Sequence, residues 1–347
     1  MKIYNIAFLL LISFSFACKD AMEFSVSSAM ANNLPIQKNN ATAANMVFKS
    51  IDGGQTWQDI SKGLPASEQG GAFFTDKSGS YLHTENGTYH NNSNATDAWE
   101  KETFSEQYSN LSPGRAGILA YTNSGYFLQK LNGSGVWLPK YTSFRGKQVY
   151  TIFESAGDAV FIGTGTGLFK STDNGNSWKH VYTGGNILKL TASDNILLAA
   201  GQAGILRSTD NGENWTPVIS EGGVGITVEC IKGGFAAISY NTASKTRRVR
   251  TSYDGGKTWQ QIDDSFPSPR SSNFIWPAAD KEMPEEAFIS SIIQVGDYFF
   301  CGHPAGILRS SNKGKTWELM LPSVGKKVFN LFVSGNVVYA IPRNGGC

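Results

Sequence analysis

Charged residues are scarce in this chain, and neither sign dominates. Asp, Glu, Lys and Arg make up 17% of the 347 residues, and the formal net charge is +2. Nucleic-acid binding normally requires a concentrated basic footprint, so this balance excludes nucleic acid as a partner. Helical periodicity is also missing after the first twenty residues. A mainly helical fold is therefore excluded as well.

The familiar catalytic and metal-binding motifs are absent too. No CxxC spacing, GxSxG elbow, P-loop or HExxH motif occurs, so we expect no metal and no cofactor. After Cys18, three cysteines remain, all in apolar strand-like contexts: Cys230, Cys301 and Cys347. We interpret them as buried thiols, and one disulfide among them is the alternative in an oxidising compartment.

The first 17 residues have the composition of a secretory signal. Met1 and Lys2 form a short basic region, and an apolar run over residues 6–16 leads to Cys18. The end of this run resembles a bacterial lipobox, which implies lipid on Cys18 after cleavage, although Phe16 departs from the usual small residue. Ordinary cleavage with an incidental cysteine is the alternative. Residues 18–44 suit a flexible tether.

The lipobox resemblance implies an exported outer-membrane lipoprotein whose membrane contact is made by lipid alone. Acyl chains would hold such a protein on the membrane essentially permanently. The segment Cys18-Lys19-Asp20 also resembles the start of lipoproteins exported to the cell surface. We therefore expect the protein to face either the periplasm or the cell surface.

A short motif ending in tryptophan recurs along the chain. The 38 glycines, the 12% aromatic content and many turn dipeptides indicate short strands joined by tight turns. Four segments read S-x-D-x-G-x-[ST]-W or nearly so, and a fifth has asparagine in place of aspartate. The five segments are residues 50–57, 171–178, 208–215, 252–259 and 310–317. They resemble the Asp-box, or BNR repeat, of sialidases and related β-propellers.

The repeat predicts an all-β, seven-bladed propeller with four-stranded antiparallel blades over residues 45–347. Two eroded copies end at Trp99 and Trp137, so seven tryptophans lie roughly 40 residues apart, about one per blade. A strand pair over residues 46–50 and 56–60 precedes the first complete blade. It should complete a last blade with the strands expected at residues 328–335 and 336–343. Such closure removes exposed sheet edges.

The motif residues have scaffold roles in this interpretation. The aspartate should accept hydrogen bonds from turn amides, the glycine should supply a positive φ, and the tryptophan should pack beneath the turn. We expect no catalysis from these positions. They are Asp52, Trp57, Asp173, Trp178, Asp210, Trp215, Asp254, Trp259, Asn312 and Trp317.

A binding site is expected on the side of the ring opposite the motif turns. An insertion over residues 264–286 separates the sixth and seventh tryptophan-marked repeats and joins two blades. Surface loops with an aromatic and basic residues are typical binding platforms. The alternatives are that Trp276 packs inward as a channel plug and that His303 is structural. The candidate residues are Trp276, Arg270, Arg247, Arg248, Lys245 and His303.

Catalysis has little support in the sequence. The sialidase resemblance implies an Arg-Ile-Pro motif near the start, and this chain has none. Carboxylates for glycoside hydrolysis would have to come from Asp263, Asp264, Asp280, Glu282, Glu285 and Glu286. The architecture also resembles the noncatalytic propellers that assist photosystem II assembly. We therefore expect a monomeric binding or assembly module for a protein or glycan ligand, with a sialidase-like glycoside hydrolase as the alternative.

Overall fold

The computed structural model describes an almost entirely β protein. Its one helical element is a short 3-10 turn, Thr142–Phe144, within the described part of the chain. No helix of these residues has the length and apolar character needed to cross a bilayer. The described residues are 45–65, 70–76, 79–92, 98–102, 108–132, 136–155, 157–266, 289–323 and 327–344.

The strands form seven sheets of four antiparallel strands each, as the repeat predicts. We number these sheets as blades in chain order. Blade 1 contains β3 (Gly70–Asp76), β4 (Gly79–Thr84), β5 (Gly87–Asn91) and β6 (Glu100–Lys101). Blade 2 contains β7 (Asn110–Gly114), β8 (Gly117–Tyr121), β9 (Phe127–Leu131) and β10 (Trp137–Lys140). Blade 3 contains β11 (Val149–Glu154), β12 (Val160–Thr164), β13 (Gly167–Ser171) and β14 (Lys179–Tyr182).

The next three blades repeat the same meander. Blade 4 contains β15 (Ile187–Ser193), β16 (Ile196–Gly201), β17 (Gly204–Ser208) and β18 (Thr216–Ile219). Blade 5 contains β19 (Gly223–Ile231), β20 (Gly234–Asn241), β21 (Thr246–Ser252) and β22 (Gln260–Gln261). Blade 6 contains β23 (Ser291–Val295), β24 (Tyr298–His303), β25 (Gly306–Ser310) and β26 (Glu318–Pro322).

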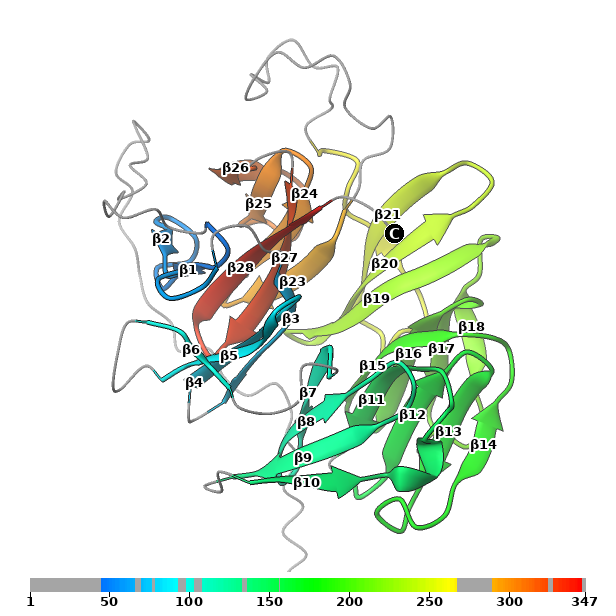
Figure 1. Cartoon of the computed structure of the whole chain (residues 1–347). Coiled ribbons are helices and arrows are strands. Elements are labelled where there is room, and N and C mark those ends of the chain that lie inside the picture. Colours follow the sequence, from blue (N-terminus) through cyan, green and yellow to red (C-terminus); the bar gives the residue numbers. More distant parts are fainter. Residues whose placement is uncertain are drawn as a thin grey trace, which may run out of the picture.

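Blade 7 is shared by the two ends of the described chain. Its strand order is β2 (Gln58–Asp59), β1 (Phe48–Ser50), β28 (Val337–Asn344) and β27 (Lys327–Ser334). Phe48 lies opposite Ala340 in the β1–β28 register, and Figure 1 shows blue β1 beside red β28. The first strands of successive blades contact one another around the ring, ending with β27 against β3. The predicted closure is therefore confirmed.

The hydrophobic core lies between neighbouring blades. Each apolar cluster of the described residues draws side chains from two adjacent sheets, as where Phe48 and Phe329 of blade 7 meet Phe300 of blade 6. Second strands are covered on both faces, which explains their continuous apolar sequences: β12, for example, is buried throughout. Each fully buried large apolar side chain contributes about 1.5–3 kcal/mol. Packing between blades therefore holds the ring together.

The meander gives the ring two sides with different turns. Because strands alternate in direction, the turns between first and second strands share a side with those between third and fourth strands. We call this the box side, because the S-x-D-x-G-x-[ST]-W turns, or box turns, lie there. The turns between second and third strands and the connections between blades lie on the other side, the connection side. All three strand pairs of each blade follow this rule.

Candidate functional site

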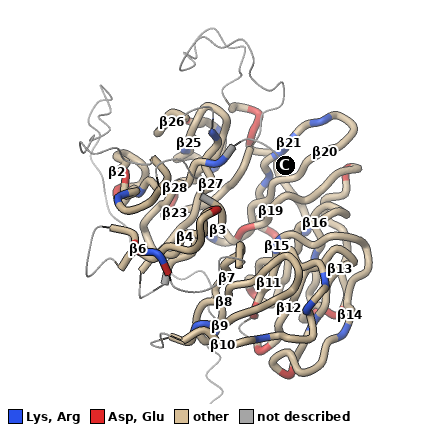
Figure 2. Tube along the Cα trace, viewed as in Figure 1, with Lys and Arg blue, Asp and Glu red and all other residues tan. Residues whose placement is uncertain are grey.

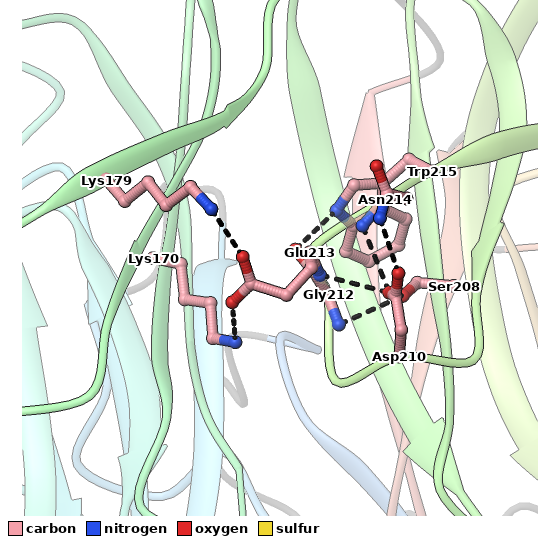
Figure 3. A network of polar contacts seen from close by, with 8 residues as sticks. All are labelled: Lys170, Lys179, Ser208, Asp210, Gly212, Glu213, Asn214 and Trp215. Carbon is pink, nitrogen blue, oxygen red and sulfur yellow. Dashed lines mark hydrogen bonds and ion pairs between the residues drawn. The ribbon is translucent and has the colours of Figure 1, made fainter.

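The five box turns share one hydrogen-bond pattern. In residues 208–215 the Ser208 hydroxyl donates to Asp210 at 2.7 Å and accepts from the Gly212 amide at 2.9 Å (Figure 3). The Asp210 carboxylate also accepts from the Asn214 amide at 3.0 Å. Each box tryptophan donates its indole N–H to the carbonyl of its own box glycine, a contact that sequence reasoning missed. Trp57 is buried and the other four are partly exposed.

These hydrogen bonds explain the electrostatics of the box aspartates. Bonds from the hydroxyl and the amide of Ser177 lower the pKa of Asp173 to about 2. In the fifth turn the Asn312 amide oxygen accepts from Ser310 at 2.9 Å and from the Thr316 amide at 2.9 Å. The same bonds thus form without charge. A group already committed to its own turn is poorly suited to acid–base chemistry.

Three of the box turns also bond to the preceding blade. Glu213, in the box turn of blade 4, is 2.6 Å from both Lys170 and Lys179 of blade 3 (Figure 3). At the position equivalent to Lys170, before the box serine, Arg207 donates to Gly255 at 2.6 Å and Arg309 to Gly53 at 2.8 Å. Each acceptor lies in the box turn of the next blade. The basic residue before the box serine is therefore a recurrent inter-blade contact.

A tyrosine–glutamate pair occurs on the box side. Tyr141 donates to Glu154 at 2.5 Å, and the Arg115 amide donates to the same carboxylate at 2.7 Å. Tyr141 is buried, and burial together with Glu154 raises its pKa far above the ordinary value. A tyrosine that acts as a nucleophile needs a lowered pKa instead. Arg115 also pairs with Asp158, which links the first turns of blades 2 and 3.

The connection side carries a polar hollow between blades 4 and 5. Its volume is about 350 Å³. Gly204 and Ile219 form its blade 4 wall, and the ends of β20, β21 and β22 form its blade 5 wall. The polar side chains that dominate its lining include Glu221, Ser239, Ser244, Thr246, Arg248 and Arg250.

Two ion pairs fix the arginines of this hollow. Arg250 lies 2.6 Å from Glu221, and Arg248 lies 3.2 Å from Asp263. Arg250 also donates to the Ser239 hydroxyl at 2.5 Å. Burial raises the pKa of Asp263, although Arg248 opposes that shift. The site therefore holds two positive charges, each matched by a carboxylate.

The predicted basic cluster is divided by the alternation of β21. Successive strand residues point to opposite faces, so Arg248 and Arg250 line the hollow while Arg247 faces blade 6, where it donates to the Ile289 carbonyl at 2.7 Å. Lys245 is exposed in the β20–β21 turn. Residues 244, 246, 248 and 250 alternate along the chain and all line the hollow. Sequence reasoning missed this period-two pattern. Figure 2 shows basic residues along this blade, while charges of both signs are spread over the ring.

His303 lies beneath the connection side rather than on it. It is 1% exposed, its Nδ1 accepts from the Ala305 amide at 3.2 Å, and its ring meets Phe266 edge to face. Burial lowers its pKa to about 4. Phe266, near the start of the predicted insertion, also packs on Trp317. Trp276 and Arg270 lie outside the described residues.

No metal or disulfide chemistry is built into the described ranges. They contain no group of three or more His, Cys, Asp or Glu placed to hold a metal ion. Cys230 and Cys301 are thiols rather than disulfide partners, the first partly exposed and the second buried. Burial, reinforced by nearby Asp263, raises the pKa of Cys301. Cys347 and the predicted lipid attachment at Cys18 fall outside the described residues.

Comparison with solved structures identifies other seven-bladed propellers. YCF48 from Cyanidioschyzon merolae matches with a TM-score of 0.58 and 13% identity, over 80% of this chain and 96% of that protein. The extracellular domain of a one-component system from B. thetaiotaomicron matches with a TM-score of 0.60 and 13% identity. That alignment covers 82% of this chain and 39% of the other, so this chain spans about two fifths of that extracellular domain.

The same fold occurs in enzymes. The GH74 xyloglucanase from Xanthomonas campestris matches with a TM-score of 0.52 and 14% identity, over 75% of this chain and 46% of the enzyme. No known family model and no curated protein matches this sequence. At these identities the similarities establish the shared fold, and the neighbours include both binding or sensor domains and hydrolases.

Proposed function

We propose that this protein is a noncatalytic binding or assembly module that takes its ligand on the connection side. The observation that carries the proposal is the polar hollow between blades 4 and 5, with exposed Lys245 in the turn at its edge. Concave sites with a few convergent polar groups are the usual places for ligands. The propeller supplies a rigid frame, and its turns supply the contacts.

The state of the carboxylates at this hollow supports binding rather than hydrolysis. Glycoside hydrolysis needs two carboxyl groups facing each other across a free space of roughly 5 to 9.5 Å. Here Glu221 and Asp263 are each joined to an arginine, at 2.6 Å and 3.2 Å. Separating either pair would leave a poorly solvated charge.

The comparison with a GH74 enzyme favours one second candidate, a glycan-directed hydrolase of sialidase-like or other propeller type. Its carboxylates would come from the predicted insertion. Asp280, Glu282, Glu285 and Glu286 lie outside the described residues, and the Asp264 carboxylate accepts a hydrogen bond from the Gln261 side-chain amide. Substitution of these insertion carboxylates therefore tests the hydrolase candidate directly.

A panel of fluorogenic glycosides, assayed beside retention on a glycan array, separates the two candidates. For the binding module we expect no turnover and retention that Lys245→Glu or Arg248→Ala weakens. Turnover that disappears in Glu282→Gln or Glu285→Gln would overturn the noncatalytic proposal. Glycan retention unchanged in both Lys245→Glu and Arg248→Ala would overturn the proposed position of the site.

The proposed module is exported and held on the outer membrane through lipid at Cys18. The apolar run before Cys18 and its lipobox-like end support this part of the proposal. The wild-type protein should pellet with membranes, whereas Cys18→Ser should move to the soluble fraction. A Cys18→Ser protein that still pelleted would contradict the anchor, and protease access in intact cells distinguishes the surface from the periplasm.

A further inference from the structure

We infer that the hollow between blades 4 and 5 is a binding site for a neutral saccharide of one or two sugar units. This inference rests on the proposed binding function and adds a ligand class to it. At about 350 Å³, the hollow is near the lower end of the range for small-molecule sites, roughly 300–1,000 Å³. That size suits a small ligand or the end of a glycan chain.

The charge balance of the hollow selects a neutral ligand. Arg250 is paired with Glu221, and Arg248 is paired with Asp263. An anion would share either guanidinium with a carboxylate already in place, which weakens its attraction. A cation would compete with the arginines for the same carboxylates. An uncharged ligand avoids both costs, because it leaves the two ion pairs intact.

The lining selects a ligand rich in hydroxyl groups. Ser244 and Thr246 hydroxyls lie 2.7 Å apart, and each hydroxyl has one donor and two acceptor positions. Their mutual bond uses one donor and one acceptor, so further bonds remain possible. Gln261 adds a side-chain amide to the lining. Sugars carry dense hydroxyl groups, which match this polar lining.

Hydrogen bonds within the chain hold the lining of the hollow in place. The Asn241 side chain accepts from the Ala243 amide at 2.9 Å and the Ser244 amide at 3.0 Å. It also donates to the Glu221 carbonyl at 2.7 Å, which ties the β20–β21 turn to the connection between blades 4 and 5. Arg250 is fixed by Ser239 and Glu221. A preformed site loses little conformational entropy on binding.

The turn that borders the hollow offers a matched pair of variants. Ser244 lines the hollow, whereas its neighbour Ala243 does not, and both are exposed. Ser244→Trp should fill the hollow from its edge, while Ala243→Trp places the same indole in the same turn without blocking it. Thr246→Val removes one hydroxyl at nearly constant volume and should weaken binding roughly fivefold, the usual effect of one hydrogen bond.

The experiment titrates cellobiose, maltose and lactose, with N-acetylneuraminate and glucuronate as charged counterparts, using saturation-transfer NMR and calorimetry on the purified protein. We expect at least one neutral sugar to bind, Ser244→Trp to lose at least tenfold in affinity, and Ala243→Trp to match the wild type. Melting curves verify that each variant is folded.

Two results would overturn the saccharide inference: binding of the charged sugars alone, or no binding of any sugar in the panel. Neutral-sugar binding that Ser244→Trp leaves unchanged would also overturn it by placing the site elsewhere. The first two results leave the broader proposal standing, because it commits to no class of sugar; it fails on enzymatic turnover or on retention insensitive to Lys245→Glu and Arg248→Ala. The two failures are therefore distinguishable.

Discussion

Glu213 of blade 4 lies 2.6 Å from Lys170 of blade 3, so a box turn is bonded to the sheet before it in the ring. The Lys170 side chain is 5% exposed and depends on this carboxylate for its charge partner. The hydrogen bond from Lys170, with a second from Lys179, lowers the pKa of Glu213. This contact makes the box turn an inter-blade element as well as a hairpin turn.

Glu213→Gln should destabilise the protein by about 1 kcal/mol at pH 7, a modest value because the Glu213 side chain is partly exposed. Since the folded-state pKa is below the unfolded value, the stabilisation is present above the ordinary pKa and is lost as the pH falls through the folded pKa. Urea unfolding between pH 7 and pH 3 should show the wild type and variant converging. Glu318→Gln is the control, because its pair with Arg309 is longer, 3.6 Å, and more exposed, and its effect should be near zero.

The box glycine is required because its backbone has a positive φ and because a Cβ would clash with the preceding blade. A second pair of variants separates these two effects. Gly212 has φ of +80°, and a Cβ there would lie 2.5 Å from the Phe161 ring of blade 3. Gly222 has φ of +73°, and a Cβ there would meet no other atom within 4 Å. Gly222→Ala should cost about 1–2 kcal/mol for the left-handed backbone alone, and Gly212→Ala about 1–3 kcal/mol more for overpacking. If chemical denaturation showed equal losses of unfolding free energy for Gly222→Ala and Gly212→Ala, the overpacking effect would be refuted.

His303 should make stability depend on pH. Its folded pKa of about 4 lies below the ordinary value of 6.5, so the unfolded chain takes up this proton first. Stability is therefore full above about pH 6.5 and declines as the pH falls toward 4, by roughly 3 kcal/mol from this group. His303→Asn, which retains an acceptor for the Ala305 amide, should show a smaller decline between pH 7 and pH 4 in denaturant titrations. If the wild type and His303→Asn lost stability in parallel, groups other than His303 would cause the decline.

Closure of blade 7 should be essential for a soluble monomer. Deleting residues 44–62 removes β1 and β2, uncovers the edge of β28, and removes the buried side chains of Val47, Phe48 and Trp57. An unpaired, apolar sheet edge promotes association, so the deletion should aggregate or fail to fold. Size-exclusion chromatography with light scattering measures the outcome, and deletion of residues 19–43 is the control. A monomeric, cooperatively melting deletion variant would contradict the closure argument.

The sequence by itself determined the number of blades and the closure, because one motif recurs wherever the same local turn forms. The serine, aspartate, glycine and tryptophan of each box interact within eight residues, and such local chemistry is readable from spacing alone. Placing strands at 328–335 and 336–343 succeeded for the same reason, since β27 and β28 follow the blade period.

Only the tertiary structure decided which side chains share a site. Arg247 and Arg248 are adjacent in sequence, yet one reaches blade 6 and the other a hollow shared with blade 4. His303 occurs in a turn on the connection side, yet the packing of Phe266 places it in the interior. Contacts between blades join residues far apart in the sequence, such as Lys170 and Glu213 at 43 positions. Their geometry depends on strand twist and on packing, neither of which leaves a local signal in the chain.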